Sequence, residues 1–133
     1  MIVGVDLHKD TAVLNAAYND AVGVTAAFNL NLLRRINREL DGGFDLQAFR
    51  HHAFYNEAER RIEMHLVSLR DQSVRIGDAA AIGFAAGETI HTEDSYKYEI
   101  ADFQRLAARA GFAPVEAWTD RERLFAIHLL RAR

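Results

Sequence analysis

A carboxylate and a hydroxyl stand two residues apart at Glu93 and Ser95. The surrounding stretch, residues 87–98, is rich in Thr, Ile and Tyr, which is typical of a β-strand. In a strand, such residues point to the same face, about 6.5–7 Å apart. They could hold a small ring with two polar nitrogens, with the carboxylate binding a donor or cationic nitrogen. Taken alone, such a pair is more often part of a strand face that contacts water.

Three further side chains are candidates for a binding site. Tyr18 and Thr25 flank the loop between the first two predicted helices, so both could face a cleft at the carboxyl end of the first strand. The alternative for both is an ordinary helix-capping loop. Met64 points inward from a predicted strand, where a single methionine usually fills the core.

The six histidines raise the question of a metal site. His51 and His52 are adjacent, so in a strand they point to opposite faces and cannot share one metal ion easily. Asp6 and His8 could share a face, but two ligands do not make a site. No His-x-x-x-His motif occurs, and there is no cysteine. We therefore expect no metal site, and histidines that are exposed or hydrogen-bonded.

Local sequence patterns predict the elements that position these residues. The apolar residues 2–5 predict a buried strand, central and parallel in its sheet, with Asp6 at its carboxyl end. Asn29 and Asn31 are expected at the edge of the second helix, because burial without partners would be costly. Helices are predicted at residues 11–18, 23–40 and 100–109, and a single turn at 45–49. Strands are predicted at residues 60–69, 73–76, 81–84, 87–98, 115–118 and 124–130, with an antiparallel meander in the middle third.

Composition narrows the class of protein. The chain has 133 residues, is 50% hydrophobic and carries a formal net charge of −3, as one folded domain would. This balance argues against a broadly cationic nucleic-acid binder. No apolar run reaches the roughly 20 residues of a membrane span, so a cytoplasmic location is expected. No two glycines form Gly-x-Gly, which excludes a dinucleotide fingerprint and a phosphate loop.

Several longer motifs occur in a fixed order along the chain. They are Val3-Gly4-Val5-Asp6-Leu7-His8-Lys9-Asp10, residues 17–29 (AYNDAVGVTAAFN), Ile36-Asn37-Arg38-Glu39-Leu40, Arg61-Ile62-Glu63-Met64, Phe84-Ala85-Ala86-Gly87-Glu88, Thr92-Glu93-x-Ser95-x-Lys97 and Trp118-Thr119-Asp120. Together they closely resemble the C-terminal part of the histidine-specific, S-adenosylmethionine-dependent methyltransferase family. Characterised members of that family trimethylate the α-amino group of L-histidine in ergothioneine biosynthesis.

The resemblance implies roles for the candidate residues. Tyr18 and Thr25 would hold the amino-acid end of the substrate, and Met64 would pack beside it. Glu93 and Ser95 would bind the imidazole ring, which agrees with the clamp inferred from their spacing. The family usually has a small apolar residue and a cysteine where this chain has Asp94 and Tyr96. Strand alternation should point Asp94 away from the pocket.

The resemblance also predicts the fold and its partners. The expected fold is α/β, a single unit comprising the C-terminal part of a Rossmann-type methyltransferase sheet (residues 1–20 and about 96–133). An antiparallel α+β substrate-binding insertion would occupy about residues 21–95. The last strand would run antiparallel inside the sheet. The main motifs for S-adenosylmethionine belong to the family's N-terminal half, which this chain does not match.

The chain is therefore expected to be the substrate-recognition half of a methyltransferase that acts on the α-amino group of histidine or a related amino acid. It would not be catalytic in isolation, and its partners would be a histidine-like small molecule and either the missing N-terminal half or a second copy of itself. Two alternatives remain open. One is a non-catalytic module that binds a histidine-like molecule, and the other is a remnant that persists as an oligomer.

Overall fold

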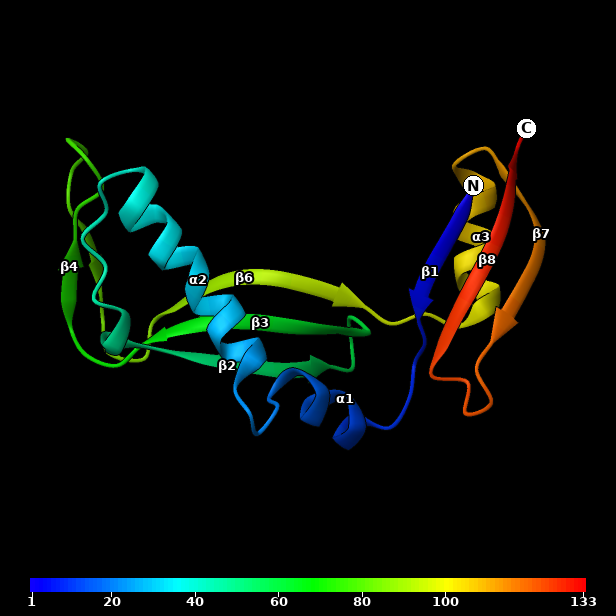
Figure 1. The fold of residues 1–133 in the computed structure, drawn as a ribbon, viewed down its shortest axis with the longest axis horizontal. Helices are drawn as coiled ribbons and strands as arrows, with labels where there is room; N and C mark the ends of the chain where they lie inside the picture. The colour runs from blue at the N-terminus through cyan, green and yellow to red at the C-terminus, as the bar shows by residue number, and fades with distance from the viewer.

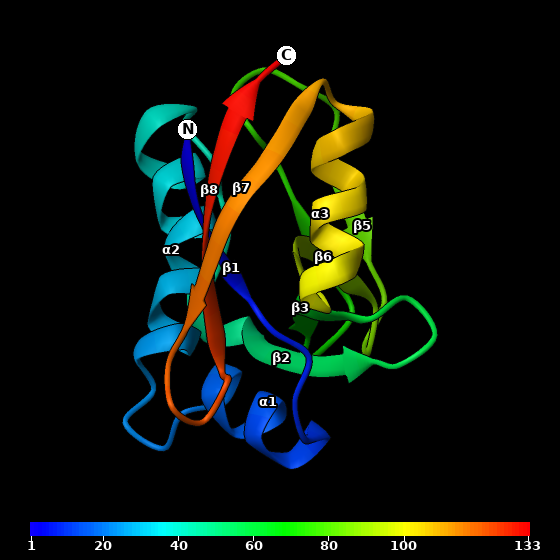
Figure 2. The same ribbon diagram turned by 90° about the vertical axis from the view of Figure 1, so that its right-hand side faces the viewer.

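The computed structural model describes residues 1–133, which form two lobes joined by two short connecting segments (Figure 1). Both termini lie in the first lobe, the sheet lobe. It contains β1 (Ile2–Asp6), α3 (Ile100–Arg109), β7 (Phe112–Thr119) and β8 (Phe125–Ala132). Figure 2 shows this lobe from its own side, with α3 beside the strands. The strand order is β1-β8-β7, and β8 is antiparallel to both neighbours. The expected position of the last strand, antiparallel inside the sheet, is confirmed.

The first strand differs from the prediction. β1 pairs with β8 alone and is antiparallel to it, so it is an edge strand here rather than a central strand between parallel neighbours. Its apolar run reflects the burial of one side of the sheet, and Val5 is 5% exposed. The opposite edge of β1 pairs with no strand of the described chain.

The second lobe, the helix-covered lobe, is built on a sheet with strand order β2-β3-β6. Its strands are β2 (Phe49–Asn56), β3 (Arg61–Ser68) and β6 (Thr89–Tyr96), all antiparallel. Two helices, α1 (Thr11–Tyr18) and α2 (Val24–Glu39), cover one face of this sheet (Figure 1). Asp10 caps α1 by accepting hydrogen bonds from the backbone of Ala12 and Val13, as the sequence predicts.

The middle third is not one continuous meander. The short strands β4 (Gln72–Val74) and β5 (Ile82–Phe84) form a separate hairpin inserted between β3 and β6. The eight-residue strands β3 and β6 pair with each other instead, because three-residue strands offer few hydrogen bonds to a ladder. The one-turn helix η1 (Leu46–Ala48) precedes β2, as predicted.

Two clusters of buried residues hold the helices on the sheet. Leu33 of α2 packs with Phe44, Phe49, Leu66 and Val74, and Phe84 of the hairpin lies against this cluster. Leu14 of α1 packs in the second cluster with Ala53, Tyr55, Ile62 and Met64, and Tyr18 lies against it. Ile62, Met64 and Leu66 alternate along β3, so the predicted inward face of that strand is confirmed.

The two connecting segments run side by side. Leu7 and Tyr98 form a parallel bridge, supported by a hydrogen bond from the Tyr98 backbone nitrogen to the Asp6 carbonyl oxygen. The carboxyl end of β1 is thereby fixed beside the end of β6. This junction brings residues from three separate parts of the sequence together.

Candidate functional site

Four side chains meet at the junction between the lobes. Tyr18 is the last residue of α1, and Asp6 is the last residue of β1. Ser95 lies near the end of β6, and Lys97 directly follows that strand. The Tyr18 Oη and Ser95 Oγ atoms are 2.8 Å apart and share a hydrogen bond. The Lys97 ammonium donates to Tyr18 Oη at 2.9 Å and to Ser95 Oγ at 2.8 Å, and it forms an ion pair with Asp6 Oδ2 at 2.8 Å.

The charge of the buried lysine is balanced by Asp6. The Lys97 side chain is 0% exposed, and its Nζ atom also lies 4.7 Å from the centre of the Tyr18 ring. Lys9 donates to the other oxygen of Asp6 at 2.5 Å. Burial opposes ionisation of the Asp6 carboxyl, but the two lysines outweigh it and hold its pKa below the ordinary value. The carboxylate therefore stays ionised and neutralises charge at the junction.

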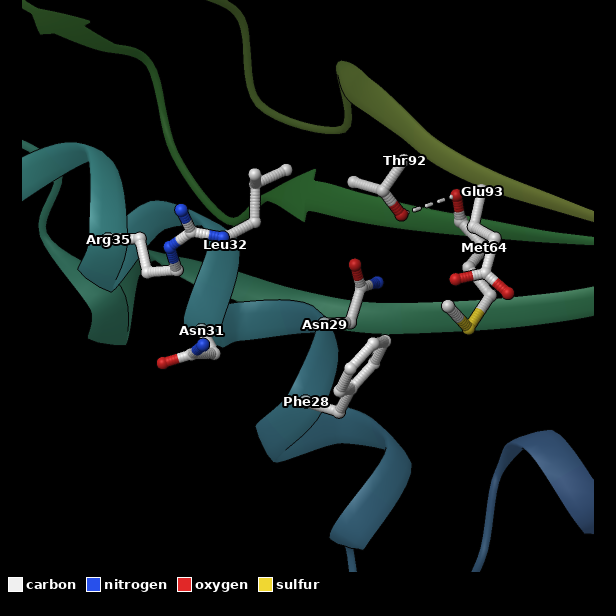
Figure 3. A pocket seen from close by; sticks show the side chains of 8 residues that line it. All are labelled: Phe28, Asn29, Asn31, Leu32, Arg35, Met64, Thr92 and Glu93. Carbon is white, nitrogen blue, oxygen red and sulfur yellow. Dashed lines mark hydrogen bonds between the residues drawn. The ribbon is translucent and has the colours of Figure 1, made fainter.

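A cavity of about 210 Å³ opens between α2 and the sheet (Figure 3). Phe28, Asn29 and Leu32 line it from the helix, and Met64, Thr92 and Glu93 line it from β3 and β6. Thr92 donates to the Met64 carbonyl oxygen at 2.9 Å, next to a shift in the register of the two strands. A cavity of this size suits a group no larger than an amino acid.

Glu93 and Ser95 lie on the face of β6 that the helices cover. Glu93 pairs with Met64 across the ladder, and Ser95 pairs with Ile62. Both partners are core residues that contact α1. The Glu93 carboxylate lines the cavity, and Ser95 lies farther along the same strand, at the junction.

Asp94 points to the other face of the sheet, as alternation predicts. It forms an ion pair there with Arg61 at 3.2 Å and a hydrogen bond with His91 at 2.8 Å. Its charge is therefore directed away from the cavity and is partly balanced by Arg61.

Thr25 does not line the cavity. Its backbone nitrogen donates to Asp20 Oδ1 at 2.8 Å, and the Val24 nitrogen donates to Oδ2 of the same carboxylate. A hydrogen bond from the Thr25 side chain, followed by the backbone bonds, lowers the pKa of Asp20 to about 2. The Asp20 carboxylate thereby caps the first turn of α2 through Val24 and Thr25.

Asn29 is buried, contrary to the expectation that it lies at the edge of its helix. It is 3% exposed, and its amide donates to the His65 carbonyl oxygen at 3.1 Å and bonds to His51 Nδ1 at 3.0 Å. The other nitrogen of His51 contacts the Tyr18 carbonyl oxygen at 2.8 Å. An Nε2–H tautomer of His51 satisfies all of these contacts. Asn29 thus connects the cavity to the backbone of Tyr18.

The face of the sheet away from the helices carries a cluster that the sequence reasoning missed. Ligand atoms of Glu63, His65 and His91 lie within 4.8 Å of one another, because β3 pairs with β6. Arg61 already donates two hydrogen bonds to Glu63, at 2.8 and 2.9 Å. The bonds from Arg61, and then that from Asn56, lower the pKa of Glu63 to about 2. Arg61 and Asn56 thus both bind the Oε1 atom of Glu63.

Lys97 and Asn29 are the two site residues that the sequence reasoning did not select. Both lie inside the motifs that carry the family resemblance. A charged residue two positions after Ser95, on the same strand face, was the available signal for Lys97. The partners of Asn29 come from other strands, so no local pattern reveals them.

The fold and the site define a domain with a small, partly polar cavity beside a buried network of ionised and hydroxyl groups. Comparison with known proteins identifies its class. The sequence model of the histidine-specific, SAM-dependent methyltransferases matches residues 1–132, and the chain belongs to this family.

Named relatives match nearly the whole chain. It is 46% identical over 121 residues to the histidine N-alpha-methyltransferase of Mycolicibacterium smegmatis, covering 90% of this chain and 38% of the relative. It is 44% identical over 130 residues to the enzyme of the same name from Mycobacterium tuberculosis, covering 97% and 40%. An L-tryptophan methyltransferase of Psilocybe serbica is 26% identical over 133 residues, covering 99% and 37%. The chain thus spans about two fifths of the relatives' length and corresponds to their C-terminal part.

Proposed function

We propose that this chain is the substrate-recognition part of an S-adenosylmethionine-dependent methyltransferase that acts on the α-amino group of histidine or a related amino acid. One observation carries the proposal. Glu93 and Ser95 share the helix-covered face of β6, Glu93 lines a cavity of amino-acid size, and Ser95 is hydrogen-bonded to Tyr18. A carboxylate and a hydroxyl at this spacing match the two nitrogens of an imidazole ring. The names of the two mycobacterial relatives support histidine as the amino acid.

The residues of this chain do not form a site for S-adenosylmethionine. None of the eight glycines belongs to a Gly-x-Gly turn. Asp6, at the carboxyl end of β1, contacts a lysine with each of its oxygens and balances their charge. We therefore assign cofactor binding to a polypeptide that corresponds to the rest of the relatives' length. Methyl transfer requires both halves, because amine and methyl donor must be held in line.

The sheet lobe supports the need for a partner. The outer edge of β1 pairs with no other strand. In addition, the face of the sheet opposite α3 carries three exposed apolar side chains, Trp118, Phe125 and Ile127, which are 45%, 45% and 43% exposed. Gly4 lies beneath the Phe125 ring, where an added Cβ would come within 2.6 Å of it. An unpaired edge and an uncovered apolar face both favour association. We propose the N-terminal part of the enzyme as the partner.

A calorimetric titration with L-histidine tests the recognition role. We expect binding, and we expect Glu93→Ala to weaken it by about 1–3 kcal/mol, or roughly 5- to 150-fold, because a polar partner is lost. Glu93→Gln, which keeps the shape and one acceptor, should lose less. Arg61→Ala is the matched control, since Arg61 lies on the opposite face of the same sheet. Unchanged affinity in Glu93→Ala would remove Glu93 from the site.

A second candidate function is favoured by the same unpaired edge. The chain could bind a histidine-like molecule as a self-associated, non-catalytic module. Light scattering and a methyl-transfer assay on residues 1–133 separate the two. Our proposal predicts no turnover by these residues alone and turnover when the N-terminal part of a relative is added. A stable oligomer that binds histidine, with no turnover under either condition, would favour the non-catalytic module.

A further inference from the structure

Lys97 is buried and contacts only groups of the protein. An ammonium group carries three N–H donors. In this structure two of them donate to Tyr18 Oη and Ser95 Oγ, the ammonium group forms an ion pair with Asp6 Oδ2, and the side chain is 0% exposed. Lys97 therefore cannot contact a bound molecule, and its influence passes through the hydroxyls that it holds.

The hydrogen bond between the Tyr18 and Ser95 hydroxyls can be assigned a donor and an acceptor. Tyr18 Oη and Ser95 Oγ are 2.8 Å apart, so one of them donates to the other. A phenolic hydroxyl is a stronger acid than an aliphatic one, and the aliphatic oxygen is the better acceptor. Tyr18 therefore donates to Ser95.

Counting lone pairs then settles what Ser95 can offer. A serine oxygen accepts at most two hydrogen bonds and donates one. Lys97 and Tyr18 fill both acceptor positions of Ser95 Oγ. The hydroxyl hydrogen is the one group that remains, so Ser95 faces a ligand only as a donor. Glu93, as a carboxylate, faces it only as an acceptor.

We propose that Lys97 is a positioning residue that makes Ser95 an obligate donor, so that the site selects a ring with one N–H and one unprotonated nitrogen. For histidine this is the neutral imidazole, with its N–H toward Glu93 and its bare nitrogen toward Ser95. The imidazolium ion, with two N–H groups, would direct a hydrogen at the Ser95 hydrogen. This inference rests on the proposed function and adds the protonation state of its substrate.

The inference has a measurable consequence. An imidazole side chain takes up a proton near pH 6.5, so the neutral ring becomes scarce at lower pH. Apparent affinity for histidine should then fall about 30-fold between pH 8 and pH 5. Without the constraint from Lys97, the anionic Glu93 would favour the cationic ring, and affinity would rise or stay level as the pH falls.

Titration of the protein itself must be separated from titration of the ligand. The charged and titratable groups around the site come from every element packed there: Asp6, Lys9, Tyr18, Arg35, His51, Glu93 and Lys97. Among these, histidine is the residue type that ordinarily titrates between pH 5 and pH 8. A ligand whose ring stays neutral throughout this range reports any contribution from the protein. The 1,2,4-triazole analogue of histidine has this property and retains both an N–H and a bare nitrogen.

The experiment is a calorimetric titration of the natural full-length protein with each ligand at pH 5, 6, 7 and 8. We expect the affinity for L-histidine to fall about 30-fold toward pH 5, and that for the triazole analogue to change less than threefold. Lys97→Met should bind histidine more weakly at pH 8 and lose most of the pH dependence, because Ser95 regains an acceptor position. If Lys97→Met fails to fold, Tyr18→Phe frees a lone pair of Ser95 in another way and should flatten the profile similarly.

Each other outcome overturns a defined claim. Histidine affinity that stays level or rises toward pH 5 in the wild-type protein would refute the role of Lys97 and leave the proposed function standing. An equal fall for the triazole analogue would place the titrating group in the protein and refute the inference too. No binding of histidine at pH 8 would refute the proposed function itself, and the inference with it.

Discussion

His128 should make the sheet lobe sensitive to acid. Its side chain is 0% exposed, neither ring nitrogen has a hydrogen-bond partner, and its ring centre lies 4.7 Å from that of Phe103 in α3. Burial lowers its pKa below the usual 6.5. As the pH falls through 6.5, the unfolded chain binds a proton that the folded chain excludes. The free energy of unfolding must therefore decrease below pH 6.5.

The size of this decrease follows from linkage. Each pH unit below the pKa of His128 in the unfolded chain lowers the free energy of unfolding by at most about 1.4 kcal/mol. At pH 5 the loss of stability due to His128 is therefore at most about 2 kcal/mol. His128→Leu replaces the ring with an apolar group of similar size that cannot take up a proton. At pH 8 the variant should be as stable as the wild-type chain or more stable, because no unpartnered nitrogen remains buried.

Urea unfolding followed by the fluorescence of Trp118 measures the pH-dependent stability of the sheet lobe, which contains His128. Trp118 is the single tryptophan, and it pairs with Ile127 in the same sheet. The stability difference between His128→Leu and the wild type should grow toward pH 5. Phe103→Leu, which alters the same contact but keeps the titrating ring, should lower stability equally at every pH. Parallel pH profiles for His128→Leu and the wild type would refute the reasoning.

Two further predictions concern the elements that support the site. Asn29→Ala should destabilise the helix-covered lobe by about 1–3 kcal/mol in urea unfolding, because the His65 carbonyl and His51 lose their donor, whereas Asn31→Ala should have little effect. Asp20→Ala should lower the helix content and the Tm through loss of the α2 cap, and Asp20→Asn should lower them less. Hydrogen bonds from Thr25 and Val24 lower the pKa of Asp20 to about 2. The stability that the ionised Asp20 cap contributes should therefore be fully present above pH 3.8 and should be lost as the pH falls through 2. Unchanged circular dichroism in Asp20→Ala would contradict the role of Asp20 as a cap.

The helices and most strands could be predicted because their signals are local. Residues 23–40 were predicted as a helix from apolar spacing, and α2 covers Val24–Glu39. Asp10 and the apolar residues after it similarly predicted α1. No helix of the structure is both long and apolar enough to cross a membrane.

Strand pairing could not be predicted to the same degree. An apolar run indicates burial on the faces of a strand but says nothing of its edges, so β1 was expected between two neighbours and has one. The hairpin of β4 and β5 was likewise placed in a continuous meander. The choice of β6 as the partner of β3 depends on the lengths of strands that are remote in sequence.

The site shows the same division between local and remote signals. The shared face of Glu93 and Ser95 follows from alternation along one strand. The partners of Ser95 do not, because Tyr18 is 77 residues away. Lys97 likewise reaches Tyr18 across 79 residues. A lysine so placed is ordinarily expected at the surface.

The burial of Lys97 also argues that the helix-covered lobe does not bind its ligand independently of the sheet lobe. A buried ammonium is tolerated when a carboxylate compensates it, and losing that partner leaves an uncompensated charge. The compensating carboxylate, Asp6, ends β1 of the sheet lobe and is fixed by the bridge between Leu7 and Tyr98. Since Lys97 in turn sets the proposed direction of the Ser95 hydroxyl, the hydrogen-bonding polarity of the candidate site depends on the sheet lobe being docked in place. A helix-covered lobe expressed without β1 would therefore lose the polarity of Ser95 even with Glu93 and Ser95 intact.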